Sequence, residues 1–82
     1  MREWSVYILE CSDKSFYTGI TKCIKSRINK HNDGKGAKYT RGRGPVRLLI
    51  FKDGLSKSEA LKLEIATKRQ PKKNRIEFLR NE

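Results

Sequence analysis

A carboxylate in the middle of an apolar helix face is the first candidate for chemistry in this sequence. Residues 56–68 have the pattern of a helix, and at about 100° per residue Glu64 projects near the centre of its apolar arc. That arc is made of Ala60, Leu61, Leu63 and Ile65. A carboxylate facing a core is costly unless a cation, a metal or a hydrogen-bond donor meets it. Glu64 is therefore either a functional carboxylate or half of a structural ion pair, for which Arg27 is the natural partner.

Arg27 and His31 interrupt the apolar arc of another predicted helix, at residues 21–32. They are four residues apart and therefore stack on one face. The arc around them is made of Cys23, Ile24 and Ile28. Polar side chains at such positions either reach to the rim of the apolar surface or line a cleft. A histidine alone is more often structural.

Two tyrosines and a glycine lie in a predicted β-hairpin. Residues 6–10 and 16–20 are rich in β-branched and aromatic side chains, and the polar turn formers of residues 12–15 separate them. Tyr7 lies near the start of the first strand and Tyr17 near the start of the second. Gly19 shares a face with Tyr17, and its missing side chain leaves room beside the phenol.

Residues 33–45 form a long glycine-rich basic loop that contains four of the six glycines. Backbone N–H groups flanked by Lys and Arg suit phosphate oxygens, and an aromatic ring there can stack on a base. The residues expected to bind nucleic acid are Lys35, Lys38, Tyr39, Arg41 and Arg43. The alternative is a disordered cationic loop. No Walker spacing is present, so nucleotide hydrolysis is not indicated.

The remaining elements are expected to position these side chains. Residues 46–52 form a near-continuous apolar run, which predicts a central strand covered on both faces. Pro71 is expected to start a basic helix over residues 72–81, with Ile76 and Leu79 facing inward.

Helix boundaries are also readable from local signals. Ser56 and Glu59 have the spacing of a capping box for the helix at 56–68. Thr21 is the expected cap of the helix at 21–32, and residues 33–34 should end it.

Length and charge set the outer limits. The chain has 82 residues, which predicts one domain over 1–82. It has 20 Lys and Arg against 9 Asp and Glu, a net charge of +11, which favours a polyanionic partner over a merely solubilising surface. No apolar run approaches the ~20 residues of a membrane span. Cys11 and Cys23 lack metal-ligand spacing and are expected to be reduced, buried side chains in a cytoplasmic protein.

These motifs together resemble the GIY-YIG nuclease superfamily, with Val6 in place of the first glycine of the signature. The resemblance extends over nearly the whole chain and rests on Tyr7, Tyr17, Gly19, Arg27, His31, the run Tyr39-Thr40-Arg41, Ala60-Leu61 and Glu64. It implies the α+β GIY-YIG endonuclease fold, a small three-stranded antiparallel sheet flanked by helices in the order β-β-α-β-α-α. Short bacterial members and the nuclease module of the UvrC incision subunit are similar in layout.

The resemblance also implies roles for the candidate residues. Glu64 would hold one divalent cation, Mg²⁺ or Mn²⁺, with the remaining ligands supplied by water and substrate. Tyr7 would act as general base, Tyr17 would orient water or phosphate, and Arg27 would contact the scissile phosphate while His31 assists. An unperturbed phenol has a pKa near ~10, so nearby positive charge would have to lower the pKa of Tyr7.

We expect a monomeric, metal-dependent endonuclease that hydrolyses DNA phosphodiester bonds, structure-selective or acting in DNA repair or recombination. The alternative from another class is a catalytically inactive basic module that binds DNA or RNA. A third possibility, a basic assembly protein, rests on composition and would be supported by a closed, buried ion pair of Arg27 and Glu64 with no cleft beside Tyr7.

Overall fold

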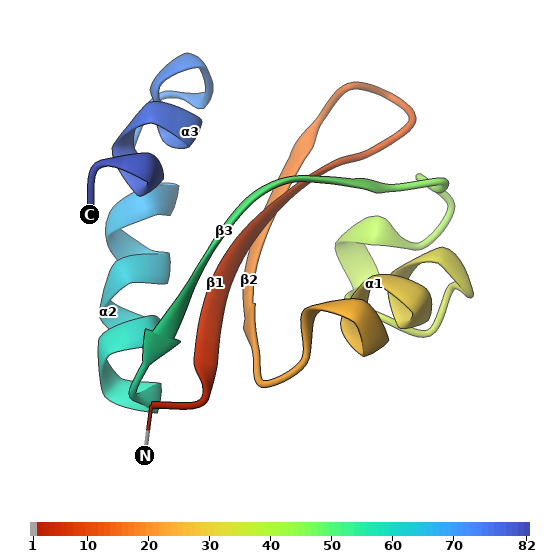
Figure 1. The fold of residues 1–82 in the computed structure, drawn as a ribbon. Helices are drawn as coiled ribbons and strands as arrows, with labels where there is room; N and C mark the ends of the chain where they lie inside the picture. The colour runs from red at the N-terminus through yellow and green to blue at the C-terminus, as the bar shows by residue number, and fades with distance from the viewer. Residues whose placement is uncertain (1) are drawn as a thin grey trace.

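The computed structural model describes residues 2–82, in which three antiparallel strands form one sheet. β1 (Trp4–Glu10) and β2 (Phe16–Thr21) form the predicted hairpin, and β3 (Arg47–Leu55) pairs with the other edge of β1 (Figure 1). The strand order is therefore β2-β1-β3. The expected α+β class and three-stranded antiparallel sheet are confirmed.

β1, and not the strand predicted from residues 46–52, is the central strand. Residues 5–9 of β1 are all buried, whereas Phe51 in β3 is 48% exposed. The prediction of a central third strand was wrong because an apolar run indicates how apolar a strand's faces are, not how many strands pair with it. β1 gains both neighbours through its hairpin with β2 and its long-range pairing with β3.

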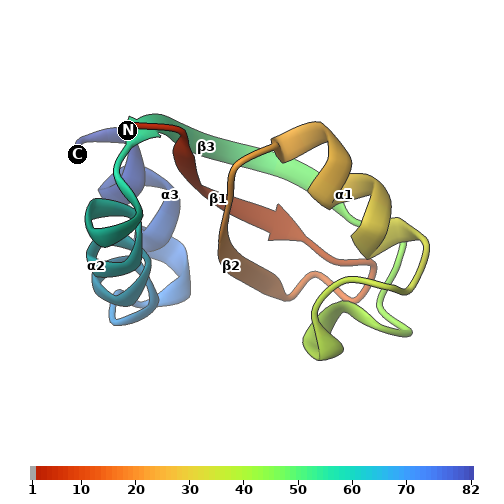
Figure 2. The ribbon, with the colours of Figure 1, turned by 90° about the horizontal axis from the view of Figure 1, so that it is seen from below.

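Three helices cover the two faces of the sheet. α1 (Ile24–Asn32) lies on one side, and α2 (Lys57–Lys68) and α3 (Lys72–Arg80) lie together on the other, as Figures 1 and 2 show. A single turn of 3₁₀ helix at Lys38–Thr40 interrupts the loop before β3. None of the helices within residues 2–82 is long and apolar enough to span a bilayer.

Alternating side chains of β1 build a separate core on each face. Val6 and Ile8 pack with Ala60 and Leu79 on the side of α2 and α3. Tyr7 and Leu9 point to the side of α1, where Ile24, Ile28, Cys11 and Val46 pack around them. A candidate catalytic tyrosine is thus part of the smaller core.

The buried stripe of α2 differs from the predicted apolar arc. Leu61 and Ile65 are 41% and 51% exposed, whereas Ala60 and Thr67 are fully buried. Thr67 can be buried because its hydroxyl donates a hydrogen bond to the Leu63 carbonyl at 2.7 Å. Hydropathy alone placed the arc too far round the helix, and Glu64 lies beside the buried stripe and not at its centre.

The predicted helix signals were correct at α2 and displaced at α1. Ser56 accepts from the Glu59 backbone N–H and the Glu59 side chain accepts from the Ser56 N–H, which completes the capping box. At α1 the N-cap is Cys23 instead of Thr21. The Thr21 hydroxyl still accepts a hydrogen bond from the Cys23 N–H, so it closes the turn just before the helix.

Both cysteines are free, but only one of them is buried. Cys11 belongs to the core beside α1, whereas Cys23 is exposed. The expectation of burial was wrong for Cys23 because the helix begins after it, which leaves its side chain outside the apolar face of α1.

The glycine-rich loop is folded against the rest of the molecule. The Ser12 N–H in the hairpin turn donates to the Arg43 carbonyl at 2.8 Å, and the Val46 N–H donates to Asn32 Oδ1 at 2.7 Å. These bonds anchor the C-terminal end of the loop to the hairpin turn and to the last residue of α1, which is not the arrangement of a disordered cationic segment.

Candidate active site

A chain of hydrogen bonds links the first tyrosine of the hairpin to the loop. Tyr7 Oη lies 2.9 Å from His31 Nε2, and His31 Nδ1 lies 2.7 Å from Thr40 Oγ1. The Thr40 hydroxyl donates its one proton to the Ala37 carbonyl at 2.9 Å. Thr40 Oγ1 must therefore accept from His31 Nδ1–H, which leaves Nε2 to accept the Tyr7 proton.

Burial keeps both members of the Tyr7–His31 pair neutral. The pKa of His31 is lowered, first by burial and second by the positive charge of Arg27. Burial raises the pKa of Tyr7 to about 12, and this effect outweighs the lowering by Arg27. The expectation that positive charge lowers the pKa of Tyr7 is thus overturned, because desolvation is the larger effect at a phenol that is 1% exposed.

Gly19 is needed for the two phenols to pack. It pairs with Tyr7 across the hairpin, and a Cβ at residue 19 would lie 2.7 Å from Tyr7 Oη and 2.9 Å from Tyr17 Cε2. The room expected beside Tyr17 is therefore filled by the end of the Tyr7 side chain. The centroid of the Tyr17 ring lies 6.2 Å from that of Tyr7 and 5.2 Å from that of His31.

Arg27 places a guanidinium beside these rings. Arg27 lowers the pKa of Tyr7 by hydrogen bonding and then by its charge, and it lowers the pKa of His31 by its charge, so it lies close to the hydrogen-bonded pair. Within residues 2–82, Arg27 Nε is buried and has no hydrogen-bond partner. A buried N–H without a partner costs free energy, so this donor suits an acceptor brought by a ligand.

Glu64 lies on α2, which packs on the opposite face of the sheet. Its side chain is 17% exposed, and its carboxylate pairs with Lys68 Nζ at 3.3 Å. The structural ion pair is therefore present, with Lys68 as the partner in place of the expected Arg27. The negative charge of Glu64 still contributes to the raised pKa of Tyr7. The closed Arg27–Glu64 pair that would indicate a basic assembly protein is absent from the described part of the chain.

A divalent metal fits Glu64 only as an incomplete site. Among residues 2–82, no three His, Cys, Asp or Glu side chains gather as a metal cluster. A hard cation such as Mg²⁺ prefers oxygen ligands and keeps several waters. One partly exposed carboxylate can hold such an ion if water and substrate oxygens complete its coordination and Lys68 releases the carboxylate.

A cavity of about 460 Å³ opens at the outer edge of β2, and we call it the Tyr17 cavity. It is lined by Phe16, Tyr17, Thr18, Tyr39, Lys68 and Arg75. Tyr17 lines the cavity and also packs against the rings of Tyr7 and His31. Lys68 lines the cavity and also pairs with the carboxylate of Glu64. Tyr7, Arg27 and His31 do not line the cavity, and the buried Tyr7 is next to it only through its packing on Tyr17.

The predicted loop residues separate into two groups. Arg43 holds the loop: its Nε donates to Asp13 at 3.0 Å, its Nη1 donates to the Tyr39 carbonyl at 2.6 Å, and its guanidinium lies 4.4 Å from the centroid of the Tyr39 ring. The Tyr39 ring also stacks on the Tyr17 ring, with 6.0 Å between the two ring centroids. The side chains of Lys35, Lys38 and Arg41 are exposed.

Sequence reasoning missed two loop residues that hold His31. Thr40 entered only as part of a motif, although its hydroxyl fixes the imidazole. Gly36 packs against the same ring, since a Cβ there would lie 2.5 Å from His31 Nδ1. A buried histidine needs a partner for each nitrogen, and that need was the available signal, but the sequence does not say which loop residue supplies the partner.

Comparison with known proteins gives a consistent result. Residues 3–77 match the family of the GIY-YIG catalytic domain. A UPF0213 protein of Cupriavidus pinatubonensis is 52% identical over 77 residues, which cover 94% of this chain and 86% of that protein.

Solved structures agree with the sequence comparison. The solution NMR structure of a UPF0213 protein from Bacillus halodurans is 46% identical, with a TM-score of 0.58, and the match covers 96% of this chain and 84% of that one. An NMR structure from E. faecalis is 36% identical, with a TM-score of 0.65 and coverage of 99% and 90%. With the fold, the tyrosine pair and the family match in agreement, this chain belongs to the GIY-YIG catalytic domain family.

Proposed function

We propose that this protein is a metal-dependent endonuclease that hydrolyses DNA phosphodiester bonds. The observation that carries the proposal is the hydrogen-bonded chain from Tyr7 through His31 to Thr40. In this chain His31 Nε2 can accept the proton of the Tyr7 phenol. The family match supports nuclease chemistry in general, and the net charge of +11 supports a polyanionic substrate.

The proton path follows from the tautomer of His31. When water attacks phosphorus and the P–O bond to the leaving sugar oxygen breaks, the water proton passes to Tyr7 Oη while the phenol proton passes to His31 Nε2. The leaving oxygen takes its proton from solvent. The imidazolium that results keeps its Nδ1–H on Thr40. Concerted transfer of the two protons avoids a free phenolate, which a pKa of about 12 disfavours near neutral pH.

Other residues bind and neutralise the phosphate. Arg27 would donate its unpartnered Nε–H to a non-bridging oxygen, and Tyr17 would orient the phosphate or the water. Because Tyr7 is nearly inaccessible to bulk solvent, the attacking water would enter together with the phosphate. Glu64 would hold Mg²⁺ or Mn²⁺, and the cation supplies charge neutralisation when bound.

The loop would contact the nucleic-acid backbone. Three of the predicted residues have exposed side chains and would bind phosphates: Lys35, Lys38 and Arg41. Tyr39 and Arg43 contact each other within the folded loop and would bind the nucleic acid without leaving that arrangement.

The test is nicking of supercoiled plasmid and branched DNA with Mg²⁺ or Mn²⁺. We expect Glu64→Gln and Tyr7→Phe to lose cleavage by about a hundredfold or more. Lys25→Gln changes an exposed residue of α1 and serves as the control that keeps activity. Equal nicking by the wild type and both site variants would reject the proposal.

A binding module without catalysis is the second candidate. Two observations favour it: Tyr7 is buried with a raised pKa, and Lys68 already neutralises Glu64. This candidate predicts nucleic-acid binding that is undiminished by EDTA, together with no cleavage under either metal.

A further inference from the structure

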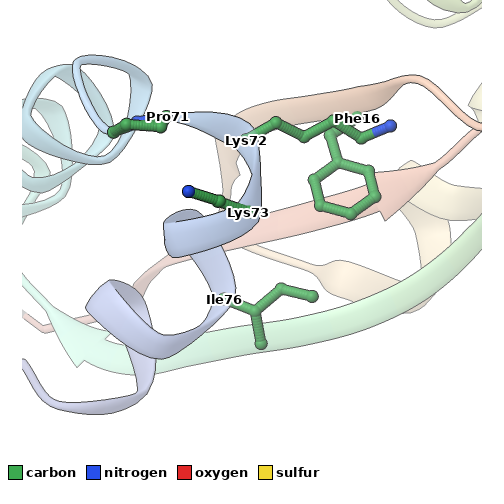
Figure 3. A pocket seen from close by; sticks show the side chains of 5 residues that line it. All are labelled: Phe16, Pro71, Lys72, Lys73 and Ile76. Atoms are coloured by element: carbon green, nitrogen blue, oxygen red, sulfur yellow. The ribbon is translucent and has the colours of Figure 1, made fainter.

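A second hollow lies between the start of β2 and α3, beside the Tyr17 cavity. It has a volume of about 500 Å³ and is lined by Phe16, Pro71, Lys72, Lys73 and Ile76. Figure 3 shows the Phe16 ring and the Ile76 side chain around it, with the two lysines extending from the start of α3. Its wall is apolar and its rim is cationic.

Phe16 lines both hollows and therefore connects them. We call the Tyr17 cavity and this second hollow together the Phe16 groove. The groove follows the outer edge of β2, which within residues 2–82 pairs with β1 alone. Each hollow falls within the ~300–1,000 Å³ of small-ligand pockets, so each has room for one nucleotide.

Both aromatic rings and cations line the groove. Phe16, Tyr17 and Tyr39 supply the rings. The cations are Lys68, Lys72, Lys73 and Arg75. Among the ion pairs of residues 2–82, only Lys68 of these four cations has an acidic partner. Lys72 Nζ lies 4.7 Å from the centroid of the Phe16 ring, so one cation is already placed at an aromatic surface.

We propose that the Phe16 groove binds a single-stranded polynucleotide. This inference rests on the nucleic-acid substrate of the proposed function and names its strand state. The cations of α3 bind the phosphates, and the rings of Phe16 and Tyr39 stack on bases. Only an unpaired base offers its ring face to a side chain, because a base in a duplex is stacked on both sides. A strand in the groove reaches Tyr17 and therefore approaches the candidate active site.

The experiment measures binding of labelled oligothymidylate in EDTA, where no cleavage can occur. We expect Phe16→Leu, which keeps an apolar side chain but removes the ring, to weaken binding about tenfold. Lys73→Gln should weaken binding and reduce the slope of log affinity against log salt by about 0.7. Lys25→Gln on α1 is the matched control for loss of one exposed charge. An oligouridylate arm distinguishes RNA from DNA as the source of the strand.

Two outcomes overturn the proposal: binding to Phe16→Leu and Lys73→Gln that equals binding to Lys25→Gln, or a duplex of equal length that binds as tightly as the single strand. Thermal unfolding checks that Phe16→Leu folds. If it does not fold, binding by Lys73→Gln alone tests the groove, because Lys73 is exposed and its replacement should not affect folding. Because cleavage is not measured, a failed groove would leave the proposed nuclease intact, and an inactive nuclease would leave groove binding intact.

Discussion

The hydroxyl of Thr40 determines which nitrogen of His31 carries the proton. It donates to the Ala37 carbonyl and so can only accept from Nδ1. The Tyr7 hydroxyl consequently meets an unprotonated Nε2. At the scale of single residues, the proposed catalysis depends on this one direction of hydrogen bonding.

Thr40→Val removes the acceptor with little change of shape. We expect cleavage to fall by about ten- to a hundredfold, because the imidazole loses its fixed tautomer. Thr40→Ser keeps the hydroxyl and should retain most of the activity. The measurement is the rate of metal-dependent cleavage as a function of pH. A Thr40→Val profile that keeps the wild-type shape and height would show that the hydroxyl plays no part.

His31 makes the stability of the protein pH-dependent. Its pKa in the folded protein lies below the ordinary value near ~6.5, so the unfolded chain binds the extra proton more readily. The free energy of unfolding should therefore decrease as the pH falls from about 7.5 to about 5.5. Urea unfolding across this range measures it.

The control for this prediction is His31→Gln. His31 is the one histidine of the sequence, and carboxyl groups titrate at lower pH. The variant should be less stable overall, but its free energy of unfolding should change little with pH over the same range. An equal pH slope in both proteins would mean that another group is responsible.

At the scale of elements, the β1–β2 hairpin brings the two phenols together. Gly19→Ala would place a Cβ 2.7 Å from Tyr7 Oη, so we expect a loss of stability of about 1–3 kcal/mol. Gly44→Ala is the matched control, because a Cβ there comes only within 4.0 Å of Asn32 Oδ1. Urea unfolding of both variants measures the difference, and equal losses would contradict a specific clash at the phenols.

The sequence predicted the elements well and their relative placement less well. The hairpin and the capping box at Ser56 depend on neighbouring residues, and both were confirmed. The central position of β1 depends on long-range pairing, which an apolar run does not encode. The ion pair of Glu64 with Lys68, and the hold of Thr40 on His31, depend on packing between elements and were missed for the same reason.

At the scale of the whole molecule, the net charge of +11 should dominate non-specific binding. Affinity for duplex DNA should fall steeply with salt, since each neutralised phosphate releases condensed counterions. Lys35→Gln and Lys38→Gln should each reduce the log–log slope by about 0.9 if these exposed loop residues contact phosphate. Fluorescence anisotropy measures the slopes, and unchanged slopes would remove the loop from the interface.

The two faces of the sheet must act together for the proposed chemistry, since α1 and the loop hold the phenol while α2 holds the carboxylate. The most direct test is the pH profile of Mg²⁺-dependent DNA cleavage by the wild type and Tyr7→Phe. We expect a wild-type rate that rises with pH as His31 loses its proton, with a midpoint below the ordinary imidazole pKa of ~6.5, and a loss of about a hundredfold or more in Tyr7→Phe. Cleavage by Tyr7→Phe at the wild-type rate would contradict it.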